Sequence, residues 1–243
     1  EMISLSGNPR VLPTFRSMRG ARSCVRNTGN LRQSNCRGSC LIPTVVPVSA
    51  ISAGAPALTG EIRFWWPNGQ TGVLSAWLEE KGVTLSAACE RTDIYIPTGS
   101  SAVNLKKRGG ERWELKTLVR EVPLVVAFAG RQECELWVKH EVSALPVSDD
   151  RQLKVNKTRW LACLDPRGEM TTGEQLAAGC QVELSEVRPE GAERTWTSFC
   201  LEAFGDIDGL AECLQAVIAR LGGCTGLLLV LPAANHPFAL VRS

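Results

Sequence analysis

Charged side chains recur at every second residue along several short β-type runs of this sequence. In a β-strand, residues i, i+2 and i+4 lie on one face, so this pattern sends charged and apolar side chains to opposite faces. The stretch VNLKKRGGERWELK, residues 103–116, shows the pattern on both sides of a Gly-Gly turn. Lys106, Glu114 and Lys116 therefore share one face of the expected hairpin, and mainly apolar residues share the other.

The same alternation predicts further strands between residues 59 and 204. The polar residues that share a face within one strand are Glu61 and Arg63, Asn104 and Lys106, Glu114 with Lys116 and Arg120, Lys139 and Glu141, Lys157 and Arg159, Glu183 and Ser185, and Ser198 and Glu202. Turn-rich segments separate these strands, which favours an antiparallel meander over a parallel sheet with crossover helices. Apolar periodicity predicts helices at 71–82 and 207–221. We therefore expect an α+β fold.

Two architectures accommodate strands with one charged and one apolar face. An open antiparallel sheet with one solvated face needs no function to explain the charges. The alternative is a closed or nearly closed β-barrel, a tunnel with a few helices packed outside and a charged lumen. Nearly every strand supplies a Lys or Arg, and the acids on these faces are all Glu. Such a lumen would hold a polyanion through its Lys and Arg, while the carboxylates would hold a hard divalent cation.

Several short motifs in a fixed order carry a family resemblance. They are TGEIR at 59–63, RTDIY at 91–95, NLK at 104–106, WELK at 113–116, KTR at 157–159, CQVEL at 180–184 and FCLEAFG at 199–205. Together they resemble the CYTH superfamily, the triphosphate tunnel metalloenzymes, and look most like a CYTH-like branch of bacterial and photosynthetic lineages. The resemblance covers residues 59 to about 240. It implies a barrel that encloses a triphosphate-binding tunnel.

The resemblance also implies roles for particular residues. Family members hydrolyse inorganic tripolyphosphate, thiamine triphosphate, or nucleoside and RNA 5′-triphosphates. The residues expected to bind phosphate are Arg63, Lys106, Lys116, Arg120, Lys139, Lys157 and Arg159. The expected ligands of Mg²⁺ or Mn²⁺ are Glu61, Glu114, Glu183 and Glu202, and the last three are also the expected catalytic residues. This is metal-assisted phosphoryl transfer, which depends mainly on positioning and charge neutralisation.

Three positions depart from the family pattern. Thr59 stands where the first glutamate of the pattern is expected, Arg63 replaces a lysine, and Asn104 replaces a cation. Arg63 still suits phosphate, because a guanidinium binds it through a bidentate fork. The other two departures leave an alternative open: a non-catalytic tunnel that binds polyphosphate-like anions, or an accessory subunit of an organellar complex.

The first 60 residues differ in composition from the rest. They contain seven arginines, no lysine, and Glu1 as their sole acid, followed by a Pro, Ala, Gly and Ser-rich stretch at 43–60. An Arg- and Ser-rich, acid-poor segment is typical of an organellar transit peptide, although an unstructured basic tail would have the same composition. We expect residues 1–56 to be a disordered extension with a linker, and 57–243 to form the tunnel domain. The resembling branch favours the chloroplast over the mitochondrion.

Other features exclude whole classes of function. No run approaches the ~20 apolar residues of a membrane span, and a net charge of +2 argues against a DNA-binding protein. The ten cysteines include no CxxC pair, so we expect reduced, mostly buried thiols and no zinc site. Neither GxxxxGK[ST] nor GxGxxG occurs. We expect the strand tryptophans to pack outward against helices; they are Trp65, Trp66, Trp113, Trp137, Trp160 and Trp196.

Overall fold

The computed structural model describes residues 56–67, 69–110, 112–126, 129–142, 152–171, 176–222 and 231–232. The predicted transit peptide and most of the linker lie outside these residues, so both stay predictions. The first strand begins at Ala57, the first residue of the predicted tunnel domain.

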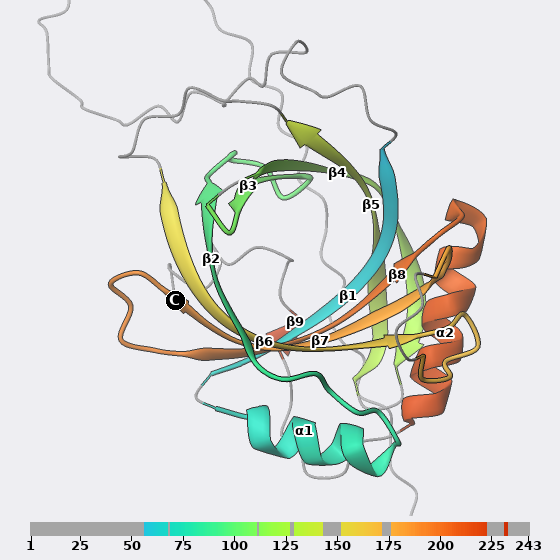
Figure 1. Ribbon diagram of the computed structural model, residues 1–243. Coiled ribbons are helices and arrows are strands. Elements are labelled where there is room, and N and C mark those ends of the chain that lie inside the picture. The colour runs from blue at the N-terminus through green and yellow to red at the C-terminus, as the bar shows by residue number, and fades with distance from the viewer. Residues whose placement is uncertain are drawn as a thin grey trace, which may run out of the picture. The chain divides into compact units, whose positions relative to one another are not determined.

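Strands dominate the described residues (Figure 1). The elements are β1 (Ala57–Pro67), α1 (Thr71–Glu80), β2 (Cys89–Ile96), β3 (Val103–Arg108), β4 (Arg112–Val126), β5 (Gly130–Val142), β6 (Leu153–Leu164), β7 (Gly179–Pro189), β8 (Trp196–Phe204), the 3₁₀ turn η3 (Ile207–Gly209), α2 (Leu210–Leu221) and β9 (Leu231–Pro232). The two predicted helices are therefore present. The second begins as a 3₁₀ turn, in which the Asp206 side chain accepts a hydrogen bond from the backbone N–H of Asp208.

The strands form a closed antiparallel β-barrel (Figure 1). Their order is β5-β4-β3-β2-β6-β7-β8-β1, and β1 also pairs with β5, which closes the ring. Each of these pairings is antiparallel. The short β9 adds a second partner to the end of β1. Of the two architectures that the sequence allows, the structure is the barrel, so the alternating charges face a common interior.

The main apolar core lies outside the barrel, where the two helices pack against it (Figure 1). The buried stripe of α2 consists of Leu210, Cys213, Leu214, Val217, Ile218 and Leu221, close to the stripe that periodicity predicts. Gly60 of β1 lets α2 begin close to the sheet, because a Cβ at this position would lie 3.3 Å from the Cβ of Leu210. Gly222 ends α2 with a φ of 62°, a conformation that favours glycine.

The prediction for the tryptophans is partly wrong. Trp66 belongs to the outer core, Trp160 packs against it, and Trp113 lies in a smaller apolar cluster. Trp65 and Trp137 instead line a cavity inside the barrel, and Trp196 packs with Trp65 in a separate buried cluster. Position 65 follows 61 and 63 on the same face of β1, so this orientation was readable from the alternation itself.

The described cysteines are all free. Of these, Cys134, Cys180, Cys200 and Cys213 are buried, Cys163 is partly buried and Cys89 is exposed. This agrees with the expectation of reduced and mostly buried thiols. None of the described helices combines the length and apolar character needed to cross a membrane.

Candidate functional site in the barrel lumen

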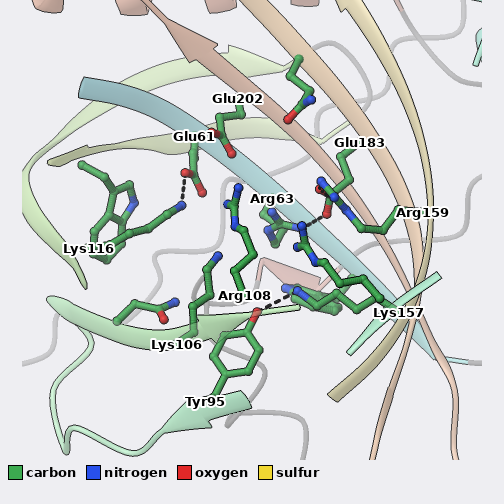
Figure 2. Close-up of a pocket in the computed structure, with 15 residues that line it drawn as sticks. Glu61, Arg63, Tyr95, Lys106, Arg108, Lys116, Lys157, Arg159, Glu183 and Glu202 are labelled. Atoms are coloured by element: carbon green, nitrogen blue, oxygen red, sulfur yellow. Dashed lines mark hydrogen bonds and ion pairs between the residues drawn. The ribbon is translucent and has the colours of Figure 1, made fainter. Parts of the chain in front are cut away.

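The charged strand faces meet around one cavity inside the barrel, with a volume of about 60 Å³ (Figure 2). Its lining consists of Glu61, Arg63, Trp65, Arg91, Tyr95, Asn104, Lys106, Arg108, Lys116, Trp137, Lys157, Arg159, Gln181, Glu183 and Glu202. Seven of these residues are Lys or Arg and three are Glu, so the lining carries a formal charge of +4. In the view of Figure 2, Glu61 and Glu202 lie at one side, and Tyr95 and Lys157 at the other.

Glu61 is the most deeply buried of the lumen glutamates, with 2% of its surface exposed. Its Oε1 forms an ion pair with Lys116, lies 3.5 Å from Lys139 Nζ, and accepts a hydrogen bond from Thr59 Oγ1 at 3.3 Å. Lys139 also pairs with Glu202, so its ammonium group bridges two carboxylates. Burial alone would raise the pKa of Glu61, but the adjacent lysines hold it well below its ordinary value. Glu61 is therefore ionised.

Glu183 is held by two guanidinium groups. Arg159 Nε donates to Glu183 Oε2 at 2.9 Å and its Nη2 contacts the same oxygen, while Arg63 Nη1 lies 3.3 Å from Oε1. Arg63 Nη1 also donates to Ser198 Oγ at 2.8 Å. Burial opposes ionisation, but the two arginines hold the pKa of Glu183 far below its usual range. The carboxylate thereby orients two forks that could bind phosphate.

Glu114 forms a third group at the edge of the cavity. Its Oε1 lies 3.0 Å from Lys106 Nζ, and its Oε2 lies 3.2 Å from Arg108 Nη2. Burial would raise the pKa of Glu114, but these two cations lower it to about 2. Arg108 was missed by the sequence analysis, although it lies on the same strand face as Lys106. Its position next to the Gly-Gly turn obscured that signal.

A fourth group around Asp93 was also missed. Asp93 is fully buried, and its carboxylate oxygens lie 3.2 Å from Lys157 Nζ and 2.9 Å from Arg91 Nε. The backbone N–H of Gly109 donates to it at 3.2 Å, and Lys157 Nζ donates to the Tyr95 hydroxyl at 2.7 Å. The signal was present in RTDIY at 91–95, where polar residues alternate on one strand face.

Most of the predicted site residues meet in the lumen. Those that line the cavity are Glu61, Arg63, Lys106, Lys116, Lys157, Arg159, Glu183 and Glu202. Glu114 and Lys139 join them through the ion pairs described above. The exception is Arg120, because the register of β4 shifts between Leu118 and Arg120. This irregularity places Arg120 opposite the outward-facing Leu136 and leaves it exposed. The predicted phosphate-binding role of Arg120 does not fit this position.

One group of side chains in the lumen has the spacing of metal ligands. Among the described residues, a carboxylate oxygen of Glu61, one of Glu202 and the Sγ of Cys200 lie within 4.8 Å of one another. Glu61 and Glu202 are register partners across β1 and β8. Carboxylate oxygens suit a hard cation such as Mg²⁺ or Mn²⁺, and the ammonium group of Lys139 contacts both carboxylates. Glu114 and Glu183 are not part of this group.

The lumen balances most of its own charge through internal ion pairs. Its glutamates and Asp93 each contact at least one Lys or Arg, yet cations remain in excess among the lining residues. A volume of about 60 Å³ holds only a few water molecules. A larger anion would therefore enter by replacing carboxylate oxygens as the partners of the long Lys and Arg side chains.

Comparison with known proteins adds no relative. No protein-family model matches the sequence, and no curated protein is similar to it.

Proposed function

We propose that the barrel binds a triphosphate-type polyanion in its lumen and hydrolyses it with the help of Mg²⁺ or Mn²⁺. The observation that carries this proposal is the excess of buried cations around one cavity. Desolvated Lys and Arg without enough carboxylate partners are costly, so the lumen favours a ligand that brings several negative charges. A chain of phosphoryl groups offers those charges together with many acceptor oxygens.

The arginines and lysines would bind phosphate in different ways. The guanidinium groups of Arg63 and Arg159, already held in place by Glu183, can each form paired hydrogen bonds to phosphate oxygens. Lys106, Lys116 and Lys157 would act as point charges along the chain. Because these cations come from β1, β3, β4 and β6, they would surround the ligand and not merely line one side of it.

Glu61 and Glu202 are the residues best placed to hold a divalent cation, and Glu183 and Glu114 would mainly orient phosphate-binding cations. The bound metal would neutralise phosphate charge and orient an attacking water. The order of motifs that resembles the triphosphate tunnel metalloenzymes supports the same assignment, and so does a closed barrel with a charged interior.

Phosphate release tests the proposal. We expect the protein to release phosphate from tripolyphosphate, thiamine triphosphate or ATP in the presence of Mg²⁺ or Mn²⁺. Glu202→Gln should lower the rate by about 100-fold or more, because it removes a metal-ligating oxygen. Glu133→Gln, which changes an exposed glutamate on β5, is the matched control and should keep the full rate. Absence of turnover by the unaltered protein across this panel would contradict hydrolysis.

Binding without hydrolysis is the second candidate function. It is favoured by Thr59, which offers a hydroxyl in place of a further carboxylate, and by the pairing of Glu61 with two lysines. In this case tripolyphosphate raises the melting temperature, but no phosphate is released with either metal. A protein that responds to no phosphate compound and co-purifies with a larger assembly would instead be an accessory subunit.

A further inference from the structure

Trp65 carries a buried hydrogen-bond donor without an acceptor. Only 3% of the residue is exposed, and in the described part of the chain its indole Nε1 has no hydrogen-bond partner. Leaving a buried N–H unpaired costs free energy, so such groups call for an explanation. Trp65 also lines the lumen cavity, where a ligand could supply the missing acceptor.

A buried N–H without a partner does not by itself indicate a ligand-binding site, as Trp66 shows. This residue is equally buried, and its Nε1 also lacks a partner among the described residues. However, Trp66 lies on the outer face of β1 in the main core, with its ring centroid 6.2 Å from that of Phe64. The described residues of this core cluster are hydrophobic. Trp65 differs because it borders a cavity that is lined by cations.

The cations next to Trp65 belong to the proposed phosphate-binding set. The guanidinium carbon of Arg63 lies 5.8 Å from the centroid of the Trp65 ring. Trp65 also packs in one buried cluster with Tyr95, whose hydroxyl accepts a hydrogen bond from Lys157 Nζ at 2.7 Å. Trp65, Arg63 and Lys157 thus line the same side of the cavity. All three are donors.

Apolar side chains fill the barrel interior beyond this side of the cavity. Trp65 and Tyr95 form a buried cluster with Val155, Val187 and Trp196. Val187 is the register partner of both Lys157 and Trp196, so these three side chains point into the barrel. Phosphoryl groups do not enter an apolar cluster, because desolvating their charge there would be too costly. A polyphosphate chain in the lumen must therefore end here.

We propose that the Trp65 indole N–H, together with Lys157, forms an end subsite that binds the terminal phosphoryl group of a linear polyphosphate chain. The inference rests on the proposed binding of a polyanion in the lumen. A terminal phosphoryl group has one more non-bridging oxygen than an internal group and can accept the additional indole hydrogen bond. The protein should consequently prefer linear chains to cyclic phosphates.

The test is a pair of conservative substitutions. Trp65→Phe and Trp66→Phe each remove one buried indole N–H while keeping an aromatic ring, and they lie on opposite faces of one strand. Binding is measured by calorimetry with EDTA present, using linear tripolyphosphate and cyclic trimetaphosphate as ligands. We expect Trp65→Phe to weaken tripolyphosphate binding about tenfold. Trp66→Phe should leave the affinity unchanged, and neither substitution should affect the binding of trimetaphosphate.

The outcomes separate this proposal from the proposed function. If the unaltered protein does not bind tripolyphosphate, polyanion binding itself is wrong. If it binds but Trp65→Phe binds as tightly, the end subsite is wrong and the wider proposal stands. Equal losses for linear and cyclic ligands would overturn the preference for chain ends. NMR of the unaltered protein gives a measurement that needs no folded variant: tripolyphosphate should shift the Trp65 indole proton downfield and leave that of Trp66 in place.

Discussion

Glu135 differs from the other carboxyls near the lumen. It is the register partner of Glu61 on β1 and of Glu121 on β4, so two carboxylates flank it. Its Oε2 accepts a hydrogen bond from Trp137 Nε1 at 3.1 Å. Burial raises the pKa of Glu135 to about 7, and the adjacent carboxylates add to the shift despite the opposing hydrogen bond. Near neutral pH, Glu135 is therefore only partly ionised.

The raised pKa predicts how stability changes with pH. Between its ordinary pKa of 4.5 and about 7, the folded state binds more protons at Glu135 than the unfolded state, so stability falls as pH rises through this range. Glu135→Gln imitates the protonated form. It should stabilise the protein at pH 8 by on the order of 2 kcal/mol and change little at pH 4.5. Urea unfolding at both pH values measures this, and equal effects at the two pH values would refute it.

Several site residues were predictable from local pattern alone. Residues 61, 63, 106, 116, 157, 159, 183 and 202 follow the two-residue period of regular strands, and all of them line the lumen. The same rule also assigns Trp65 to the lumen, but its large, apolar side chain favoured the prediction that it packs in the outer core. Asp93 lies in the RTDIY motif at 91–95, but its role was not predictable, because nothing in the local sequence shows that Lys157 will neutralise it.

At the scale of the element, one irregularity in β4 decides which of its cations face the lumen. Up to Leu118 the strand alternates regularly, and Lys116 pairs in register with Lys139. The shift before Arg120 turns the rest of the strand over by one residue, because the side-chain period is two. The same strand thus carries a lumen cation before the shift, Lys116, and an exposed cation after it, Arg120.

The register shift in β4 gives a matched pair of substitutions on the same strand. Lys116→Met should weaken tripolyphosphate binding by about tenfold or more, since it removes a buried cation that would contact the proposed ligand. Arg120→Ala should leave the affinity unchanged, because its side chain lies outside the lumen. Calorimetric titration of both variants, after circular dichroism has shown that each is folded, decides the matter. A loss of affinity in Arg120→Ala would contradict the position of the register shift before Arg120.

For the whole molecule, the lumen couples folding to the ionisation of several carboxyl groups. Burial opposes their ionisation, but neighbouring cations lower the pKa values of Glu61, Asp93, Glu114 and Glu183. A depressed pKa contributes stability above the unfolded value, and this stability is lost as pH falls toward the folded value. These groups lie on β1, β2, β4 and β7, so their protonation weakens ion pairs on four different strands of the barrel.

We therefore expect acid unfolding to be steep. The free energy of unfolding should fall from about pH 5 downward as these carboxyl groups protonate, by about 3 kcal/mol for Glu114, whose pKa is about 2. Together with the opposite trend of Glu135, this places maximum stability near pH 5. Urea titrations from pH 8 to pH 2 measure the profile. A free energy that stays constant between pH 5 and pH 3 would show that the ion pairs do not contribute as described.

The sequence by itself determined the strands, the two helices and the charged face of each regular strand, because these depend on periods of two and 3.6 residues within short segments. Only the tertiary structure decided that β1 closes onto β5, that β2 pairs with β6, and that the charged faces enclose a lumen. It also decided which cation neutralises which carboxylate, and that Arg120 lies outside. These outcomes depend on register between segments far apart in the chain, which no local period encodes.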